Sequence, residues 1–462
     1  MPETPGTLSL AEALSAATDT RRLEIGAGII TTTPNIFRQQ FGERPAVIVA
    51  DVNTFRAAGQ VVDKAFRAAG HSMLDPFIFR APDLYAEHGY VLDLEAMLRS
   101  NSAIPVAVGA GTINDLTKLA SHRTERPYVC VGTAASMDGY TAFGASISYQ
   151  GSKQTFQCPA PVAVVADLDV ICAAPVEMNA WGYADLVAKV PAGADWILAD
   201  AVGSDPIDRQ AWAIVQGRLR EMVADPAGIG RRDPAALGKL IEGLMLSGFA
   251  MQSAKSSRVA SGAEHMFSHM WDMQHHTHNG RVPSHGFKVG IGTLATTALY
   301  ERLLARGVEK LEVAQCCAAW PDEESWVARA HDLLGGGALA ELGARELGAK
   351  YSSRAQLGEQ LNLLKAHWPK LRERLEAQLL PLATLRRMLE EAGAPTKPEQ
   401  IGITRERLRR TYWQASCIRR RFTVLDFAIR TGLLDTCLDE IFGPAGIWPA
   451  AAPARTSPND QA

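Results

Sequence analysis

The stretch IPVAVGAGTINDLTKLASH (104–122) decides the fold, because it joins an apolar, β-rich run to a helix through a glycine turn. The run over 104–111 predicts a buried parallel strand, and the segment that begins at Thr112 predicts a helix. The same order recurs around it. Further strands are predicted at 45–52, 76–80, 127–134 and within 162–175, and further helices after Asn53, which is expected to cap the first, and over 91–100. This alternation predicts a doubly wound α/β domain with a parallel sheet.

The alternation stops near Pro175, and helical periodicity follows in nearly every segment from about 177 to 446, as in RQAWAIVQGRLREMVA (209–224). We therefore predict three regions: an α/β domain over 1–176, an all-helical domain over 177–448 and a disordered, low-complexity tail over 449–462. A ligand is expected in the cleft between the two domains.

Composition excludes several classes of protein. The chain has 462 residues, with 47 Lys and Arg against 50 Asp and Glu, so its net charge is only −3. This balance gives no reason to expect binding to nucleic acid or to an anionic membrane. The sequence has no apolar window of about 18 residues and no basic start typical of a signal peptide. Its seven cysteines are sparse and lack CxxC spacing, as in reduced cytoplasmic proteins.

Glycine and polar residues follow three of the predicted strands at their carboxyl ends. They are Asp51 after the first strand, Gly109, Gly111 and Thr112 after the third, and Thr133, Ser136 and Asp138 after the fourth. At such an edge, backbone N–H groups can approach a pyrophosphate and a carboxylate can accept ribose hydroxyls. These residues are candidates for binding a dinucleotide in the 1–176 domain. A structural tight turn at 109–112 and a helix-capping role for Asp51 explain the same pattern equally well.

Histidines concentrate in one stretch of the helical region. Six of the eleven lie within 265–285: His265, His269, His275, His276, His278 and His285. His265 and His269 are four residues apart and share a helix face, and His285 begins another predicted helix. Together with a carboxylate such as Asp185, two of these imidazoles could hold a divalent cation with an open position. Solvated or capping histidines are the alternative, and the favoured one for His275, His276 and His278.

Five segments, taken in order, resemble one known family. They are GAGTINDLTK (109–118), TAASMDGYT (133–141), GYADLVAK (182–189), SGAEHMFSHMWDMQHH (261–276) and SHGFKVGIGTL (284–294). This set is similar to the glycerol-1-phosphate dehydrogenases, within the superfamily of metal-dependent alcohol dehydrogenases, glycerol dehydrogenases and dehydroquinate synthases. RERLRRTYWQASCIRRRFTVLDFA (405–428) resembles their bacterial branch.

The resemblance implies a role for each matching residue. Asp185, His265 and His285 match metal ligands, Asp138 and His269 match residues that face the substrate, and Gly109, Gly111, Thr112, Thr133, Ser136 and, more weakly, Asp51 match cofactor-binding positions. It also implies NAD or NADP as cofactor, Zn²⁺ or Ni²⁺ as metal, and a homodimer. The implied reaction interconverts dihydroxyacetone phosphate and sn-glycerol 1-phosphate, a step suited to the synthesis of lipid backbones.

Three alternatives remain at this point: a glycerol or polyol dehydrogenase that needs no phosphate, a cyclase of the dehydroquinate or inosose synthase type, and a non-catalytic protein with the same fold. The phosphate of the implied substrate needs positively charged donors. Lys118, Lys153 and Lys288 are candidates by charge alone, although a solvated surface lysine is the favoured interpretation of each.

Overall fold

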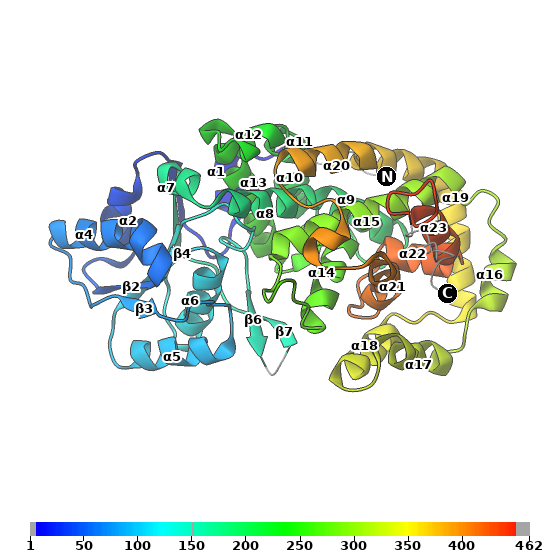
Figure 1. Cartoon of the computed structure of the whole chain (residues 1–462), viewed down its shortest axis with the longest axis horizontal. Coiled ribbons are helices and arrows are strands. Elements are labelled where there is room, and N and C mark those ends of the chain that lie inside the picture. Colours follow the sequence, from blue (N-terminus) through cyan, green and yellow to red (C-terminus); the bar gives the residue numbers. More distant parts are fainter. Residues whose placement is uncertain (1–5, 150–151, 450–462) are drawn as a thin grey trace, which may run out of the picture.

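A six-stranded parallel sheet forms the N-terminal part of the chain (Figure 1). The computed structural model describes residues 6–149 and 152–449. In spatial order, the strands are β1 (Arg22–Gly26), β8 (Ala163–Asp167), β5 (Val129–Gly132), β4 (Ile104–Gly109), β2 (Ala46–Asp51) and β3 (Phe77–Phe79). Every neighbouring pair in this sheet is parallel. All six carboxyl ends therefore lie along one edge.

The sheet is buried on both faces, as the continuous apolar runs predict. Along β2, Val47 and Val49 pack into one hydrophobic cluster, whereas Ile48 and Ala50 pack into another. Two pairs of helices cover the two faces: α2 (Thr33–Phe41) and α4 (Gln60–Ala68) on the side of Ile48, α5 (His88–Arg99) and α6 (Gly111–Arg123) on the side of Val47. The predicted doubly wound architecture is confirmed.

At the ends of two strands, one local prediction is confirmed and another is corrected. The segment 162–175, predicted to hold one or two strands, contains one, β8, before it turns into α7 (Leu168–Ala173). After β2, the cap is Asp51 instead of Asn53: Asp51 Oδ1 accepts hydrogen bonds from the N–H groups of Asn53 at 2.7 Å and of Thr54 at 2.9 Å. The carboxylate stands one residue before the first helical turn, where a cap must stand. The chain then passes through α3 (Val52–Thr54) and a π-helical turn, η2 (Phe55–Gly59), into α4.

In the C-terminal part, after β8, every helix or strand formed by the described residues is a helix, as predicted (Figure 1). Its elements are α8 (Val176–Val187), α9 (Lys189–Ala201), α10 (Arg209–Gln216), α11 (Leu219–Met222), α12 (Pro226–Gly230), α13 (Pro234–Ala254), η3 (Ser257–Ala260), α14 (Ala263–Met273), α15 (His285–Arg306), α16 (Val313–Ala319), α17 (Glu323–Leu334), α18 (Ala338–Ala349), α19 (Arg354–Gln378), α20 (Leu382–Glu391), η4 (Pro398–Ile401), α21 (Arg405–Ser416), α22 (Val424–Arg430) and α23 (Leu434–Ile441). Among the described residues, no helix combines the length and apolar character needed to cross a membrane.

The N-terminal segment joins both parts of the molecule. Helix α1 (Leu10–Ala16) packs against α13, and the Gln252 Oε1 on that helix accepts hydrogen bonds from the N–H groups of Asp19 at 3.0 Å and Thr20 at 3.3 Å. An η1 turn (Ile30–Thr32) leads into α2, and an antiparallel hairpin, β6 (Ala145–Tyr149) and β7 (Ser152–Phe156), projects from the α/β part toward α14. The boundary at 176 stays a prediction, and the predicted tail lies outside the described residues except for Pro449.

Candidate metal and dinucleotide site

Three helices bring together the three predicted metal ligands. Asp185 lies on α8, His265 on α14 and His285 at the first position of α15, and each offers a ligand atom within 4.8 Å of the other two. The two imidazole rings are 5.3 Å apart between centroids. Residues separated by up to 100 positions in the chain thus converge at one point, which the sequence pattern alone did not establish.

Two glycines in α15 allow this convergence. A Cβ at Gly286 would lie 2.0 Å from the carbonyl oxygen of Trp181 on α8, and a Cβ at Gly292 would lie 2.3 Å from that of Glu264 on α14. Any side chain at either position would push α15 away from its neighbours, because such distances are well inside van der Waals contact. The glycines therefore set how closely the three ligand-bearing helices approach.

The donor set suits a divalent metal. Two imidazole nitrogens and one carboxylate oxygen are the ligands of many catalytic zinc sites, which keep one position open. Burial lowers the pKa of His285 to about 3, so its ring is neutral and its nitrogen lone pair is available. Although burial opposes it, hydrogen bonds to Asp185 and Glu264 raise the pKa of His265. A cation would bind at His265 Nε2, the ring nitrogen that faces Asp185.

Glu264 orients His265, although no pattern in the sequence predicted this role. Its Oε1 accepts a hydrogen bond from His265 Nδ1 at 2.8 Å and another from the N–H of Gly262 at 2.6 Å. This leaves His265 Nε2 facing Asp185 Oδ1, at 3.4 Å. Carboxylates that hold the second nitrogen of a metal-binding histidine are common in metal sites. Adjacent residues on a helix point in different directions, so spacing gave no signal for this pair.

Lys189 is a second residue that sequence reasoning missed. Its Nζ lies 2.8 Å from Asp138 Oδ2 and 2.9 Å from Asp185 Oδ1, and its side chain is completely buried. Asp138 Oδ2 also accepts a hydrogen bond from Ser247 Oγ at 2.8 Å, and the N–H of Asp138 donates to Asp185 Oδ2 at 3.1 Å. Lys189 therefore ties the predicted substrate-facing aspartate to the predicted metal ligand. Its spacing of four residues from Asp185 was the available signal.

His269 lies beside the same point. Its ring centroid is 6.2 Å from that of His265 and 6.1 Å from that of His285. Burial, followed by the positive charge of Arg419, lowers the pKa of His269 well below its usual value. The ring is therefore neutral and can both accept and donate a proton.

The predicted dinucleotide-binding residues lie along the carboxyl edge of the sheet. Gly109 ends β4, and α6 begins at Gly111 with Ala110 as its cap, so no cap side chain bonds to the N–H groups of the first turn. The N–H of Thr133, just after β5, donates to the carbonyl of Gly109 at 3.2 Å. Free N–H groups at a helix start favour a pyrophosphate, so these residues fit a dinucleotide. At Asp51, Oδ1 serves as a helix cap.

The loop after β5 connects the two halves of the site. Thr133 and Ser136 are buried at the sheet edge, and two residues further on Asp138 bonds to Asp185 in the helical part. Gly182 permits this contact, since a Cβ there would lie 1.9 Å from the carbonyl oxygen of Ala135. The loop therefore places the predicted cofactor edge directly beside the three metal-ligand candidates.

Other predicted groups have different partners. Lys118 Nζ bonds to the carbonyl oxygens of Gly139, Ala142 and Gly144, at 3.0, 2.9 and 3.0 Å. Lys288 is buried in an ion pair with Asp272. Both lysines are therefore structural, and neither is the solvated surface residue that we favoured.

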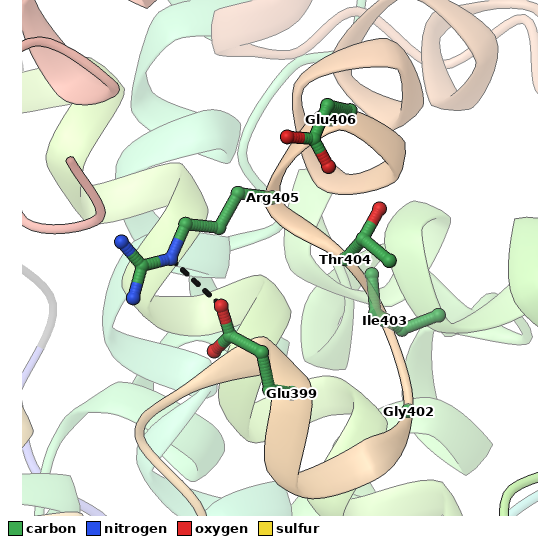
Figure 2. A pocket seen from close by; sticks show the side chains of 6 residues that line it. All are labelled: Glu399, Gly402, Ile403, Thr404, Arg405 and Glu406. Carbon is green, nitrogen blue, oxygen red and sulfur yellow. Dashed lines mark hydrogen bonds and ion pairs between the residues drawn. The ribbon is translucent and has the colours of Figure 1, made fainter. Parts of the chain in front are cut away.

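His276 also has a structural role, but it is buried within the protein and is not solvated. Its Nε2 bonds to the carbonyl oxygen of Ile401 at 2.7 Å, and Arg407 Nη1 lies 2.7 Å from its Nδ1. Figure 2 shows the neighbouring surface pocket, where an ion pair of 2.7 Å joins Glu399 to Arg405; the lining residues are Glu399, Gly402, Ile403, Thr404, Arg405 and Glu406. None of the predicted site residues lines this pocket.

The fold and this arrangement define a class of protein. Residues 24–175 match the family described as iron-containing alcohol dehydrogenase. Two solved structures share the fold across both parts of the chain. A probable glycerol dehydrogenase from Sinorhizobium meliloti has a TM-score of 0.58 and 16% identity, over 91% of this chain and 98% of that one. Glycerol dehydrogenase from Schizosaccharomyces pombe also has a TM-score of 0.58, with 15% identity over 99% and 98%.

Comparison with curated proteins narrows the class to one family. Glycerol-1-phosphate dehydrogenase [NAD(P)+] of Halalkalibacterium halodurans is 32% identical over 292 residues, which cover 63% of this chain and 73% of that protein. The protein of the same name from Geobacillus thermodenitrificans is 30% identical over 387 residues, 83% of this chain and 86% of that one. The chain belongs to the glycerol-1-phosphate dehydrogenase family.

Proposed function

We propose that this protein is an NAD(P)-dependent oxidoreductase that interconverts dihydroxyacetone phosphate and sn-glycerol 1-phosphate. One observation carries the proposal: Asp185, His265 and His285 converge beside Asp138, at the carboxyl edge of a parallel sheet. A metal centre next to a dinucleotide edge suits hydride transfer to a carbonyl carbon. The names of the curated relatives supply the substrate that we propose.

Each residue of the site has a part in this reaction. Asp185, His265 and His285 would hold the metal, and the turn at Gly109–Thr112 with Thr133 and Ser136 would hold the dinucleotide. When bound, the metal supplies Lewis-acid stabilisation of the developing negative charge and the nicotinamide supplies or accepts the hydride.

Asp138 and His269 would act on the substrate itself. The contacts of Lys189 and Ser247 both go to Asp138 Oδ2, so Oδ1 is left to accept a hydrogen bond from a substrate hydroxyl. His269, kept neutral by its surroundings, would hold or move the proton that accompanies the change between carbonyl and alcohol. These two residues orient the substrate and complete the proton balance.

Several finer features belong to the same proposal. Zn²⁺ and Ni²⁺ are both suited to two imidazoles and a carboxylate, and we propose one of them as the metal. A homodimer and synthesis of lipid backbones follow from the family resemblance. A cytoplasmic location is supported by the seven cysteines, all free within the described part of the chain.

The decisive experiment compares the variant His285→Ala with the parent protein. We expect loss of bound metal and of NADH- or NADPH-dependent reduction of dihydroxyacetone phosphate, because one of three ligands is removed. His275→Ala is the matched control, since this exposed imidazole belongs to the same stretch of sequence and lies outside the site. Retention of both activity and metal by His285→Ala would eliminate the proposed centre.

The same assays separate this activity from its alternatives. The parent protein is expected to prefer dihydroxyacetone phosphate to dihydroxyacetone, whereas a polyol dehydrogenase would show the reverse. It should also consume one NADH for each product formed. A cyclase regenerates its cofactor in every turnover, so turnover of a cyclase substrate without net NADH consumption would contradict the proposal.

A further inference from the structure

Most positive charges close to the candidate centre already have partners. Lys118, Lys189 and Lys288 are bound by carbonyl or carboxylate oxygens, as described above. Two arginines after α21 are also engaged. Arg420 Nη2 lies 3.1 Å from Glu346 Oε1, and Arg421 Nη1 donates to the carbonyl oxygen and the hydroxyl of Ser261, at 2.5 Å each. The charges of these lysines and arginines therefore stabilise the fold, and we do not assign them to a ligand.

Arg419 differs from both neighbours. Its guanidinium has no hydrogen-bond or ion-pair partner among residues 6–149 and 152–449, although the side chain is partly buried. Glu346 is the acidic group whose charge acts on it, and that carboxylate is already bonded to Arg420. Burial lowers the pKa of Arg419, as expected when a charge loses water without gaining a partner. Removing a cation from water costs free energy, which is recovered only when an anion binds to the cation.

The path of the chain places Arg419 beside α14. Before it, Trp271 Nε1 donates to Thr411 Oγ1 at 3.1 Å, so α21 lies against the C-terminal half of α14. After it, Arg421 is bonded to Ser261, just before α14 begins. Arg419 therefore belongs to a segment that is anchored against α14 on both sides.

Electrostatics agree with this position. Among the charges that lower the pKa of His269, that of Arg419 is the largest. Lys153, on β7 of the hairpin that packs against α14, adds a second positive charge, which acts on both His269 and His285. Two positive charges therefore act on the rings of the candidate centre, and of the two only Arg419 offers a fork of N–H donors.

We propose that Arg419 binds the phosphate group of the substrate. This inference rests on the proposed function, since it assigns a phosphate subsite to the same centre. A guanidinium can offer two parallel N–H donors to two phosphoryl oxygens, a geometry that a lysine cannot provide. The phosphate that would pair with Arg419 then belongs to the substrate that reacts next to His269.

The test uses the metal-loaded protein and the ratio of kcat/KM for dihydroxyacetone phosphate to that for dihydroxyacetone. Arg419→Gln is expected to lower this ratio by about ten- to hundredfold, the effect of losing a hydrogen bond to a charged group. Inorganic phosphate, used as a competitive inhibitor, should bind more weakly to this variant by a similar factor. Arg420→Gln is the matched control. It removes the same charge from the next residue along the chain, whose guanidinium is already paired with Glu346.

The outcomes distinguish the inference from the function on which it rests. If the parent protein prefers dihydroxyacetone phosphate and Arg419→Gln keeps that preference and its affinity for inorganic phosphate, the subsite is wrong and the function stands. If the parent protein itself prefers dihydroxyacetone, the proposed function fails. Equal metal content and thermal unfolding in all three proteins exclude a general loss of structure as the cause of the change.

Discussion

His265 Nδ1 lies 2.8 Å from Oε1 of Glu264, the residue that directly precedes it on α14. The same carboxylate oxygen accepts the N–H of Gly262, so its position is fixed by the backbone before α14. The hydrogen bond therefore sets the orientation of the imidazole and directs its Nε2 toward Asp185. A buried carboxylate thus fixes the orientation of a predicted metal ligand.

We expect Glu264→Gln to weaken metal binding by about 10- to 100-fold, because an uncharged amide holds the histidine less firmly and makes it less basic. Metal affinity would be measured by competition with a chromophoric chelator. Glu341→Gln serves as control, since its side chain is 73% exposed and distant in sequence from the site. Equal affinities for both variants and the parent would show that Glu264 does not position the ligand.

Lys189→Met should destabilise the metal-free protein by about 3–5 kcal/mol, because Asp138 and Asp185 would lose their common buried cation. Added metal should recover part of this loss, since it supplies positive charge next to Asp185. Denaturant unfolding with and without metal checks both effects. In the double variant with Asp138→Asn, the loss should be smaller than the sum of the single losses; strict additivity would mean that the lysine and Asp138 do not interact.

The contribution of His285 to the stability of the metal-free protein should fall as the pH decreases below about 6.5. His285 has a pKa of about 3 in the folded protein against 6.5 for an ordinary histidine, so the unfolded chain binds a proton that the folded protein excludes. The contribution of His285 to the free energy of unfolding is complete above pH 6.5. Between pH 6.5 and pH 3 it declines by up to about 1.4 kcal/mol per pH unit. His285→Gln should flatten the dependence measured by urea unfolding, whereas His275→Gln should not. An unchanged slope in His285→Gln would refute this assignment.

Gly286→Ala should displace α15 from α8 and reduce the bound metal, since the new methyl group would lie 2.0 Å from the carbonyl oxygen of Trp181. We expect a loss of about 1–3 kcal/mol in unfolding free energy. Gly290→Ala, one turn further along α15, is the matched control because its methyl group would meet only the Ala184 Cβ, at 3.2 Å, and a Leu389 methyl group, at 3.8 Å. Similar metal content in the two variants would show that close packing at Gly286 does not build the site.

Sequence reasoning reached most of the fold because each element carries its own pattern. The apolar run of β4, the glycine turn and the periodicity of α6 each follow from a few consecutive residues. Capping was less certain, since Asp51 and Asn53 both suit a helix start and only the backbone path decides between them. The hairpin β6–β7 was not predicted, although Ala145, Ile147 and Tyr149 alternate with serines along β6.

For the candidate site, the sequence determined which residue types were available and which shared a helix face, as with His265 and His269. The tertiary structure decided which groups the charged side chains contact. Lys118 and Lys288 are bound within the protein, and Lys189 joins two carboxylates. Arg419 has no partner among the described residues. The physical reason is that periodicity acts over one or two turns of chain, whereas charges pair through space. Only the packing of α8, α14 and α15 fixes those distances.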